Sequence, residues 1–368
     1  MKGLFFSDDL LDQKRKEGDP KIDSILRDYF QDPENKKELK IWLESLKTNN
    51  DIYSNSNLSK EVQNQLISVL DLPPWYSEEK FTRAQIFFVR NSPWIMNLLG
   101  LLSLPYCYAA ANGARVLGFT ERLSLETEQR LRETAEFVWG MMNPSSLKSE
   151  GNGLIMILKI RLIHAFIRKS LLQNPSWNLD WGIPLNQEDM AGTNLSFSLI
   201  IIRGLRKIGI HCSMEDQEAF LHSWNLIGYL LGLNTELIPE RPQDTIQLEK
   251  KIKERQFRES EQGKKLTAEL LKYFHQLPKV PGRPQIFVEN WMLDLMGQDI
   301  GKLLGIKRAQ KSGLSLTQLY LLNQFGFLNK GNNKETFETR YTRYQLEGQK
   351  TRNLDIPWDN YSKYPLPM

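Results

Sequence analysis

A long segment without charge constrains the fold of this chain more than any other feature. No Asp, Glu, Lys or Arg occurs from Asn91 to Ala114, and the stretch from Trp94 to Ala111 is mostly apolar. This approaches the length of a membrane-spanning helix. Asn97 and Ser103 make it too polar, however, and Pro105 would break a spanning helix. We therefore predict two wholly buried helices with a break near Pro105.

Helical periodicity dominates the rest of the chain, and the alternation typical of strands is nearly absent. A rigid Pro-Pro pair at 73–74 separates a polar first part from the apolar region. We predict an all-α fold with three parts: a polar helical N-terminal extension (1–71), one large helical domain (72–330) and an extended C-terminal tail (331–368).

The composition excludes several classes of function. The 48 basic and 44 acidic residues are interspersed, and no basic cluster is interleaved with aromatic residues, which argues against nucleic acid as a partner. Cys107 and Cys212 form no disulfide framework and suit a reducing compartment. No export signal precedes Asp8, so we expect a cytoplasmic protein. Contact with a membrane surface and the oligomeric state stay open.

One histidine lies in a helix that a cofactor could use. Of the histidines at 164, 211, 222 and 275, only His164 is mid-helix in a strongly apolar segment, Leu154 to Leu172. Arg161 and Arg168, at i−3 and i+4, share its face. A haem needs a neutral imidazole for its iron, apolar walls for the porphyrin and cations for its propionates. His164 is thus a candidate metal ligand, with Arg161 and Arg168 as propionate contacts. A core histidine that hydrogen-bonds a neighbour is the alternative.

Two further helices carry candidate site residues. Arg130 and Thr134 lie one turn apart, between the charged and the apolar faces of a predicted helix over 124–142. His222 is a rival ligand in a helix over 214–231, where nearby glycines would let a flat ring approach. A structural position in the core is the interpretation that we favour for His222. The chain has no phosphate-binding loop, Gly-x-Ser-x-Gly or Cys-x-x-Cys signature, so an enzyme of this sequence would rely on a cofactor.

Four motifs in order resemble a known family. They are Arg130-Leu131-Arg132-Glu133-Thr134, Lys159-Ile160-Arg161-Leu162-Ile163-His164-Ala165, the stretch from Gly182 to Thr193, and the stretch from Leu221 to Gly232. Together they are similar to the oxygenase family that includes the latex-clearing protein (rubber oxygenase) and MpaB. The similarity runs from about Pro74 to Pro239 and continues more weakly to about Leu304.

The resemblance implies a globin-like helical core around a b-type haem, with His164 as the proximal iron ligand. It implies Arg130 and Thr134 on the oxygen side, and oxidative cleavage of carbon–carbon double bonds in isoprenoid chains. Glu133 stands where the rubber oxygenase has a lysine that can cap the iron, and would leave that position open, hold a water or point elsewhere. The region 109–115, where the family's catalytic glutamate is expected, contains no acid.

The expected function is therefore a haem b oxygenase that combines dioxygen with a small hydrophobic, isoprenoid or lipid-like substrate. Polyisoprene itself is extracellular and does not fit the expected cytoplasmic location. The ring nitrogen of His164 that does not bind iron should be held by a hydrogen-bond acceptor. The alternative is a non-catalytic helical haem- or lipid-binding protein.

Overall fold

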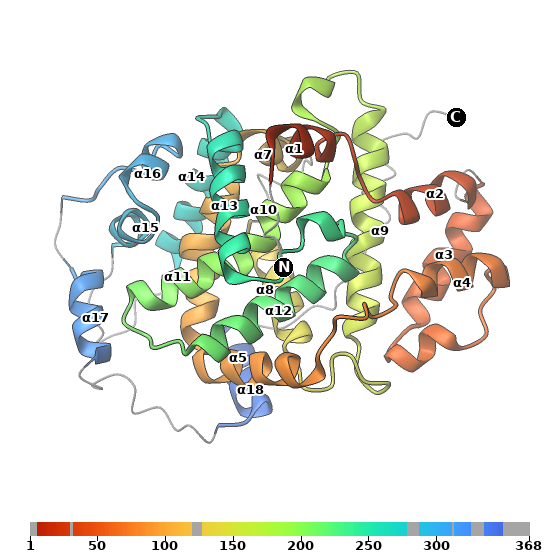
Figure 1. Ribbon diagram of the computed structural model, residues 1–368, viewed down its shortest axis with the longest axis horizontal. Helices are drawn as coiled ribbons and strands as arrows, with labels where there is room; N and C mark the ends of the chain where they lie inside the picture. Colours follow the sequence, from red (N-terminus) through yellow and green to blue (C-terminus); the bar gives the residue numbers. More distant parts are fainter. Residues whose placement is uncertain are drawn as a thin grey trace.

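The computed structural model describes residues 6–29, 32–119, 127–277, 287–310, 313–324 and 335–348. These residues form helices packed around one main hydrophobic core (Figure 1). Within the described ranges the only strand-like pairing is an isolated antiparallel bridge between Ala110 and Phe257. The prediction of an all-α fold is confirmed.

The helices follow one another in this order: α1 Asp8–Lys14, α2 Pro20–Tyr29, α3 Pro33–Ser45, α4 Lys60–Ser68, α5 Glu78–Leu98, a π-helix Leu99–Ser103, α6 Leu104–Tyr108, α7 Ala111–Phe119, α8 Thr127–Met141, α9 Gly153–Leu172, α10 Gln187–Phe197, α11 Leu199–Lys207, α12 Met214–Leu230, α13 Pro242–Gln256, α14 Glu261–Gln276, α15 Val288–Met296, α16 Gln298–Leu303, α17 Leu316–Gln324 and α18 Phe337–Gly348. Short 3₁₀ turns lie at Asn49–Tyr53, Leu179–Trp181 and Thr235–Leu237.

The uncharged segment stays helical for longer than its sequence predicts. Helix α5 continues through Pro93 and passes directly into the π-helix, where the Leu104 N–H bonds the carbonyl of Leu99. The predicted break near Pro105 is wrong. Pro105 lies in the first turn of α6, where a missing N–H costs little, and the chain leaves helical geometry only at Ala109 and Ala110.

The polar N-terminal part contributes apolar side chains to the main core. Leu11, Ile22, Leu39 and Leu66 are fully buried, one from each of its four α-helices. Figure 1 shows α2, α3 and α4 beside α9. The polar composition therefore reflects amphipathic helices, whose charged faces meet solvent while their apolar stripes face inward. The domain boundaries proposed above stay predictions.

Part of the expected extended tail is helical. Helix α18 places Phe337, Tyr341 and Tyr344 around the indole of Trp139 on α8, at ring-centroid distances of 5.4–5.5 Å. The Tyr341 hydroxyl donates to the carboxylate of Glu136 at 2.6 Å. The sequence of this segment shows no helical periodicity, and its packing against α8 explains why it is nevertheless helical. The remainder of the predicted tail lies outside the described residues.

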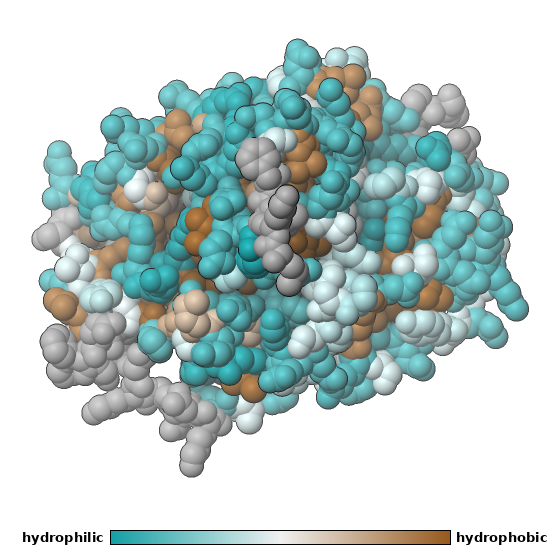
Figure 2. Space-filling model, viewed as in Figure 1, coloured by the Kyte–Doolittle hydropathy of each residue, from teal (hydrophilic) through white to brown (hydrophobic). Residues whose placement is uncertain are grey.

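No helix in the described ranges has both the length and the apolar character that crossing a bilayer requires. The face in Figure 2 is mostly hydrophilic, with apolar side chains scattered across it. The uncharged segment is accordingly covered by other helices, and Leu98, Leu102 and Tyr108 are each less than 4 % exposed.

Candidate functional site

His164 lies at the middle of α9 in an environment that keeps its imidazole neutral. Burial, assisted by the charge of Arg168 and opposed by that of Asp19, lowers the pKa of His164 to about 4. Its Nδ1 atom is buried and has no hydrogen-bond partner. We expected a hydrogen-bond acceptor to hold the ring nitrogen of His164 that does not bind iron. No such acceptor contacts Nδ1. A buried polar atom without a partner is rare and needs an explanation, and a ligand to this imidazole would supply one.

Arg161, one turn before His164, is fully engaged within the protein. Its Nε and Nη2 atoms bind the carboxylate of Asp19, the latter at 2.9 Å. Its Nη1 atom donates to the carbonyls of Val69 at 2.8 Å and Leu230 at 3.0 Å. Arg161 therefore joins α9 to the N-terminal part and to the end of α12.

Arg168, one turn after His164, has the same kind of environment. It is 2 % exposed and pairs with Asp23 at 2.8 Å, and its Nη1 donates to the carbonyl of Leu185 at 3.1 Å. Both guanidinium groups are thus held by carboxylates of the N-terminal part. The role of Arg161 and Arg168 as propionate contacts stays a prediction, and it would require a propionate to displace those carboxylates.

Arg130 and Thr134 lie on α8, and this helix packs against α9, which carries His164. The contact includes Gly140 near the end of α8, which lies directly against the Met156 side chain near the start of α9. The structure thus brings together the two helices that carry the predicted site residues.

Arg130 interacts with a tyrosine that the sequence analysis did not identify. Tyr108, at the end of α6, is 3 % exposed, and its burial raises the pKa of its hydroxyl. The charge of Arg130 and its hydrogen bonding to that hydroxyl oppose the rise. Glu133 accepts a hydrogen bond from Gln129 at 2.9 Å, so its carboxylate is held along α8. The signal for Tyr108 was a phenol within an uncharged segment, which needs a polar partner when buried.

His222 has a structural role that uses the lone pair a metal would need. Its Nε2 accepts the backbone N–H of Ser77, at the start of α5, at 3.1 Å. The ring meets the edge of Trp75 at 5.6 Å and stacks on Tyr76. Burial and the charge of Lys80 lower its pKa to about 4. The role of His222 as a rival cofactor ligand stays a prediction, and it would require a ligand to displace this contact with the α5 backbone.

The run Asn186-Gln187-Glu188-Asp189, part of the third sequence motif, also has an architectural explanation. Asn186 caps α10, and the Gln187 amide donates to the carbonyl of Gly232 at 2.9 Å. The buried Glu188 carboxylate binds Arg255 at 2.8 Å and Arg15 at 3.2 Å. These bonds tie α1, α10 and α13 together, so this motif supports the fold around the site.

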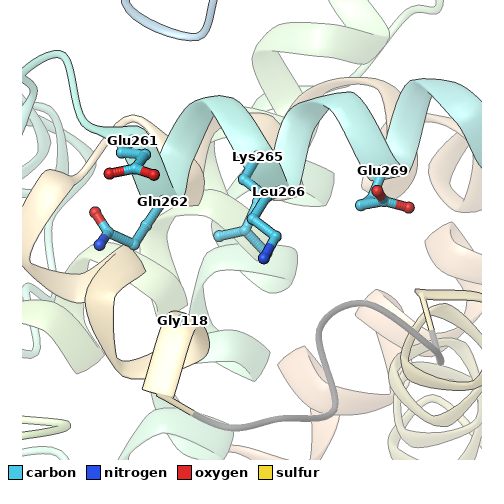
Figure 3. A pocket seen from close by; sticks show the side chains of 6 residues that line it. All are labelled: Gly118, Glu261, Gln262, Lys265, Leu266 and Glu269. Atoms are coloured by element: carbon cyan, nitrogen blue, oxygen red, sulfur yellow. The ribbon is translucent and has the colours of Figure 1, made fainter.

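Two surface hollows lie away from these residues. One, of about 150 Å³, lies between Gly118 of α7 and Glu261, Lys265 and Glu269 of α14 (Figure 3). The other, of about 500 Å³, lies between residues 6–9 and α13. Sites for organic ligands usually occupy roughly 300–1,000 Å³ and are lined mainly by apolar groups. The first hollow is too small and the second too polar for a porphyrin.

The fold is all-α, and the comparisons with known proteins identify the chain as an oxygenase and give its family. Residues 94–322 match the family described as ER-bound oxygenase mpaB/B'/rubber oxygenase, catalytic domain. The chain belongs to this MpaB/rubber oxygenase family. The resemblance inferred from the four sequence motifs is thereby confirmed.

A relative and a solved structure agree with this assignment. The rubber oxygenase of Streptomyces sp. (strain K30) is 23% identical over 296 residues, which are 80% of this chain and 70% of that protein. The structure of latex clearing protein in the closed state superposes with a TM-score of 0.73 at 19% identity, covering 95% of this chain and 90% of that one. The structural likeness therefore extends over the N-terminal helices as well.

Proposed function

We propose that this chain is a haem b oxygenase in which His164 binds the iron. The observation that carries the proposal is the imidazole of His164, held neutral at physiological pH with a buried nitrogen that lacks a partner. Iron takes the neutral form of imidazole. Haem would supply the dioxygen chemistry that protein side chains lack.

The donor set favours haem over a bare metal ion. No group of three or more His, Cys, Asp or Glu side chains in the described parts of the chain is arranged to hold a metal ion. A haem iron would need only one imidazole from the protein, since the porphyrin nitrogens supply most of its other ligands. His164 meets that requirement alone.

The residues of α8 would act on the side where dioxygen and substrate meet. Arg130, steadied by the Tyr108 hydroxyl, can donate hydrogen bonds to an oxygen-rich group. Thr134 lies one turn after Arg130 on the same helix, and its hydroxyl can accept or donate a hydrogen bond. Glu133 bonds Gln129, which supports a role in ordering the α8 surface rather than capping the iron.

A hydrophobic substrate agrees with the side chains around this region. Leu131 of α8 and Ile160 and Ile163 of α9 pack on the core but remain partly exposed. Such side chains can line the dry walls that oxygen chemistry on an apolar molecule requires. Rubber, named for the Streptomyces relative, belongs to the isoprenoid class. We propose a smaller isoprenoid or lipid-like substrate, and the cytoplasmic location stays a prediction.

The first test is the visible spectrum of the protein purified from haem-sufficient cells. The wild type should show a Soret band and about one haem per chain, and His164→Ala should lose both while keeping its helical circular dichroism. His275→Ala is the matched control, because His275 is exposed and pairs with Glu289. A His164→Ala protein with full haem content would contradict the assignment.

The second test is turnover. Dioxygen uptake with squalene as the probe, and carbonyl products trapped by a hydrazine reagent, should depend on His164 and on bound haem. A protein that binds haem yet consumes no dioxygen with squalene or other isoprenoid probes would instead be the non-catalytic haem-binding alternative.

A further inference from the structure

Arg115, near the middle of α7, has an unusual environment for a partly buried cation. Its guanidinium carbon lies 4.2 Å from the ring centroid of Trp181. Its Nε atom is buried without a hydrogen-bond partner. Within the parts of the chain that the structure describes, the side chain makes no ion pair. A guanidinium stacked on an indole is oriented, but its N–H groups remain unsatisfied.

The surroundings of Arg115 connect it to the His164 helix. Its neighbour Val116 packs in a small apolar cluster with Leu171 of α9 and Trp177. Ile167, also of α9, and Trp181 border the same cluster. These two α9 residues follow His164 by one and two turns and lie on its side of the helix.

The distance along α9 suits one ligand that spans both places. Leu171 is seven residues after His164, which corresponds to about 10 Å along the helix axis. A flat or elongated apolar molecule beside His164 could therefore place a polar end near Arg115. Ile167 and Leu171 on this side of α9 are apolar, and Arg168 beside them is already paired with Asp23. The guanidinium of Arg115 is therefore the strong polar contact that remains for such a ligand.

Other buried arginines of this region are all paired. Arg161 and Arg168 bind Asp19 and Asp23, and Arg15 binds Glu188 and Asp189. Burial of a charge without a partner is unfavourable, and hydrogen bonding to a carboxylate compensates for it. Among the described residues, Arg115 has no carboxylate partner of the kind that these arginines have.

We propose that Arg115, positioned by Trp181, binds a carboxylate at the end of a ligand that lies along α9 from His164. The carboxylate comes from a haem propionate or from an acidic, lipid-like substrate. The first source rests on the proposed haem function, whereas the second does not.

The experiment for the first source compares proteins loaded with haem b and with haem dimethyl ester, whose propionates carry no charge. Haem loss is followed as transfer to excess apomyoglobin. Arg115→Gln should release haem b about tenfold to a hundredfold faster than wild type, the range expected for a charge-assisted hydrogen bond. Release of the dimethyl ester should not change. Arg27→Gln, on an exposed arginine, is the matched control.

The experiment for the second source measures binding of oleate. If the carboxylate belongs to a substrate, Arg115→Gln should leave haem b release unchanged and weaken oleate binding about tenfold or more. Arg115→Lys keeps the charge without the planar fork and should give an intermediate effect in whichever assay responds. It also provides the test if Arg115→Gln does not fold.

Unchanged haem b release together with unchanged oleate binding would overturn the proposal. If the wild type holds no haem, the proposed function fails, and the oleate measurement still decides the role of Arg115. Equal acceleration for haem b and its dimethyl ester would show loss of packing rather than of carboxylate binding, and would also overturn it.

Discussion

Two sets of buried polar side chains lie along α9, and they differ in whether their hydrogen bonds are complete. Arg161 and Arg168 are saturated by Asp19, Asp23 and backbone carbonyls. His164, between them in sequence, has an unpartnered Nδ1 atom. The saturated set, Arg161 and Arg168, holds helices together, whereas the function proposed above assigns a ligand to the unsaturated imidazole of His164. Under that proposal, completeness of hydrogen bonding separates architecture from function on a single helix.

The same distinction applies beyond α9. Glu188 is fully buried and bonded by Arg15, Arg255 and Gln256. Arg115 is partly buried and stacked, yet its Nε has no partner. The comparison yields opposite expectations for substitution: removal of a saturated partner should cost stability, and removal of an unsaturated group should cost ligand binding.

The largest expected effect is at the saturated set. Asp19→Ala would leave Arg161 buried without its carboxylate, so the free energy of unfolding should fall by roughly 3–5 kcal/mol. Urea unfolding followed by circular dichroism measures this. Asp28→Ala, which removes an exposed pair with Arg27, should change stability by less than about 1 kcal/mol. If both variants lowered the free energy of unfolding by similar amounts, the complete hydrogen bonding of Arg161 would not contribute more to stability than an exposed ion pair.

An intermediate effect is expected at Tyr108. Tyr108→Phe keeps the buried ring and removes the hydroxyl that interacts with Arg130. Loss of one hydrogen bond to a charged group should lower the rate of dioxygen uptake about tenfold, while the Soret band per chain is retained. If Tyr108→Phe instead lost haem, and the dioxygen uptake per bound haem stayed the same, Tyr108 would have a structural role like that of Arg161 and Arg168.

Sequence periodicity predicted the helices and the apolar environment of His164, because both depend on local spacing. It could not predict the partners of Arg161 and Arg168. Asp19 and Asp23 lie more than a hundred residues earlier, and only the packing of α2 against α9 brings them to these arginines. An arginine at i−3 or i+4 looks the same in sequence whether it faces a propionate or an aspartate.

The residues that sequence reasoning missed depend on contacts between helices. Arg115 is the first charge after the uncharged segment, which is a visible signal, but its lack of a partner appears only when Trp181 is placed beside it. His222 was a plausible ligand from its glycine neighbours, and only the start of α5 shows that its Nε2 is used. Whether the hydrogen bonds of a buried side chain are complete depends on the three-dimensional packing, so the periodicity of the sequence could not show it for Arg115 or His222.

The smallest expected effect is the pH dependence of stability, and it compares the two buried histidines directly. The pKa values of His164 and His222 are lowered from 6.5 to about 4 in the folded chain. The unfolded chain therefore binds protons more readily between pH 6.5 and 4, and the free energy of unfolding falls as the pH drops through that window. Each histidine should contribute roughly 1–2 kcal/mol between pH 7 and 5 in the haem-free protein, with the more exposed His222 at the lower end because solvent screens its shift.

Glutamine at either position should remove its share of this pH dependence, as measured by urea unfolding at pH 7 and pH 5. The two variants should differ in haem. His222→Gln should keep the Soret band across this range, because the partner of His222 is the Ser77 backbone. His164→Gln should lack the band at every pH. If His222→Gln also lost haem, both histidines would be needed for haem binding. The completeness of their hydrogen bonds would then no longer distinguish a structural histidine from an iron ligand.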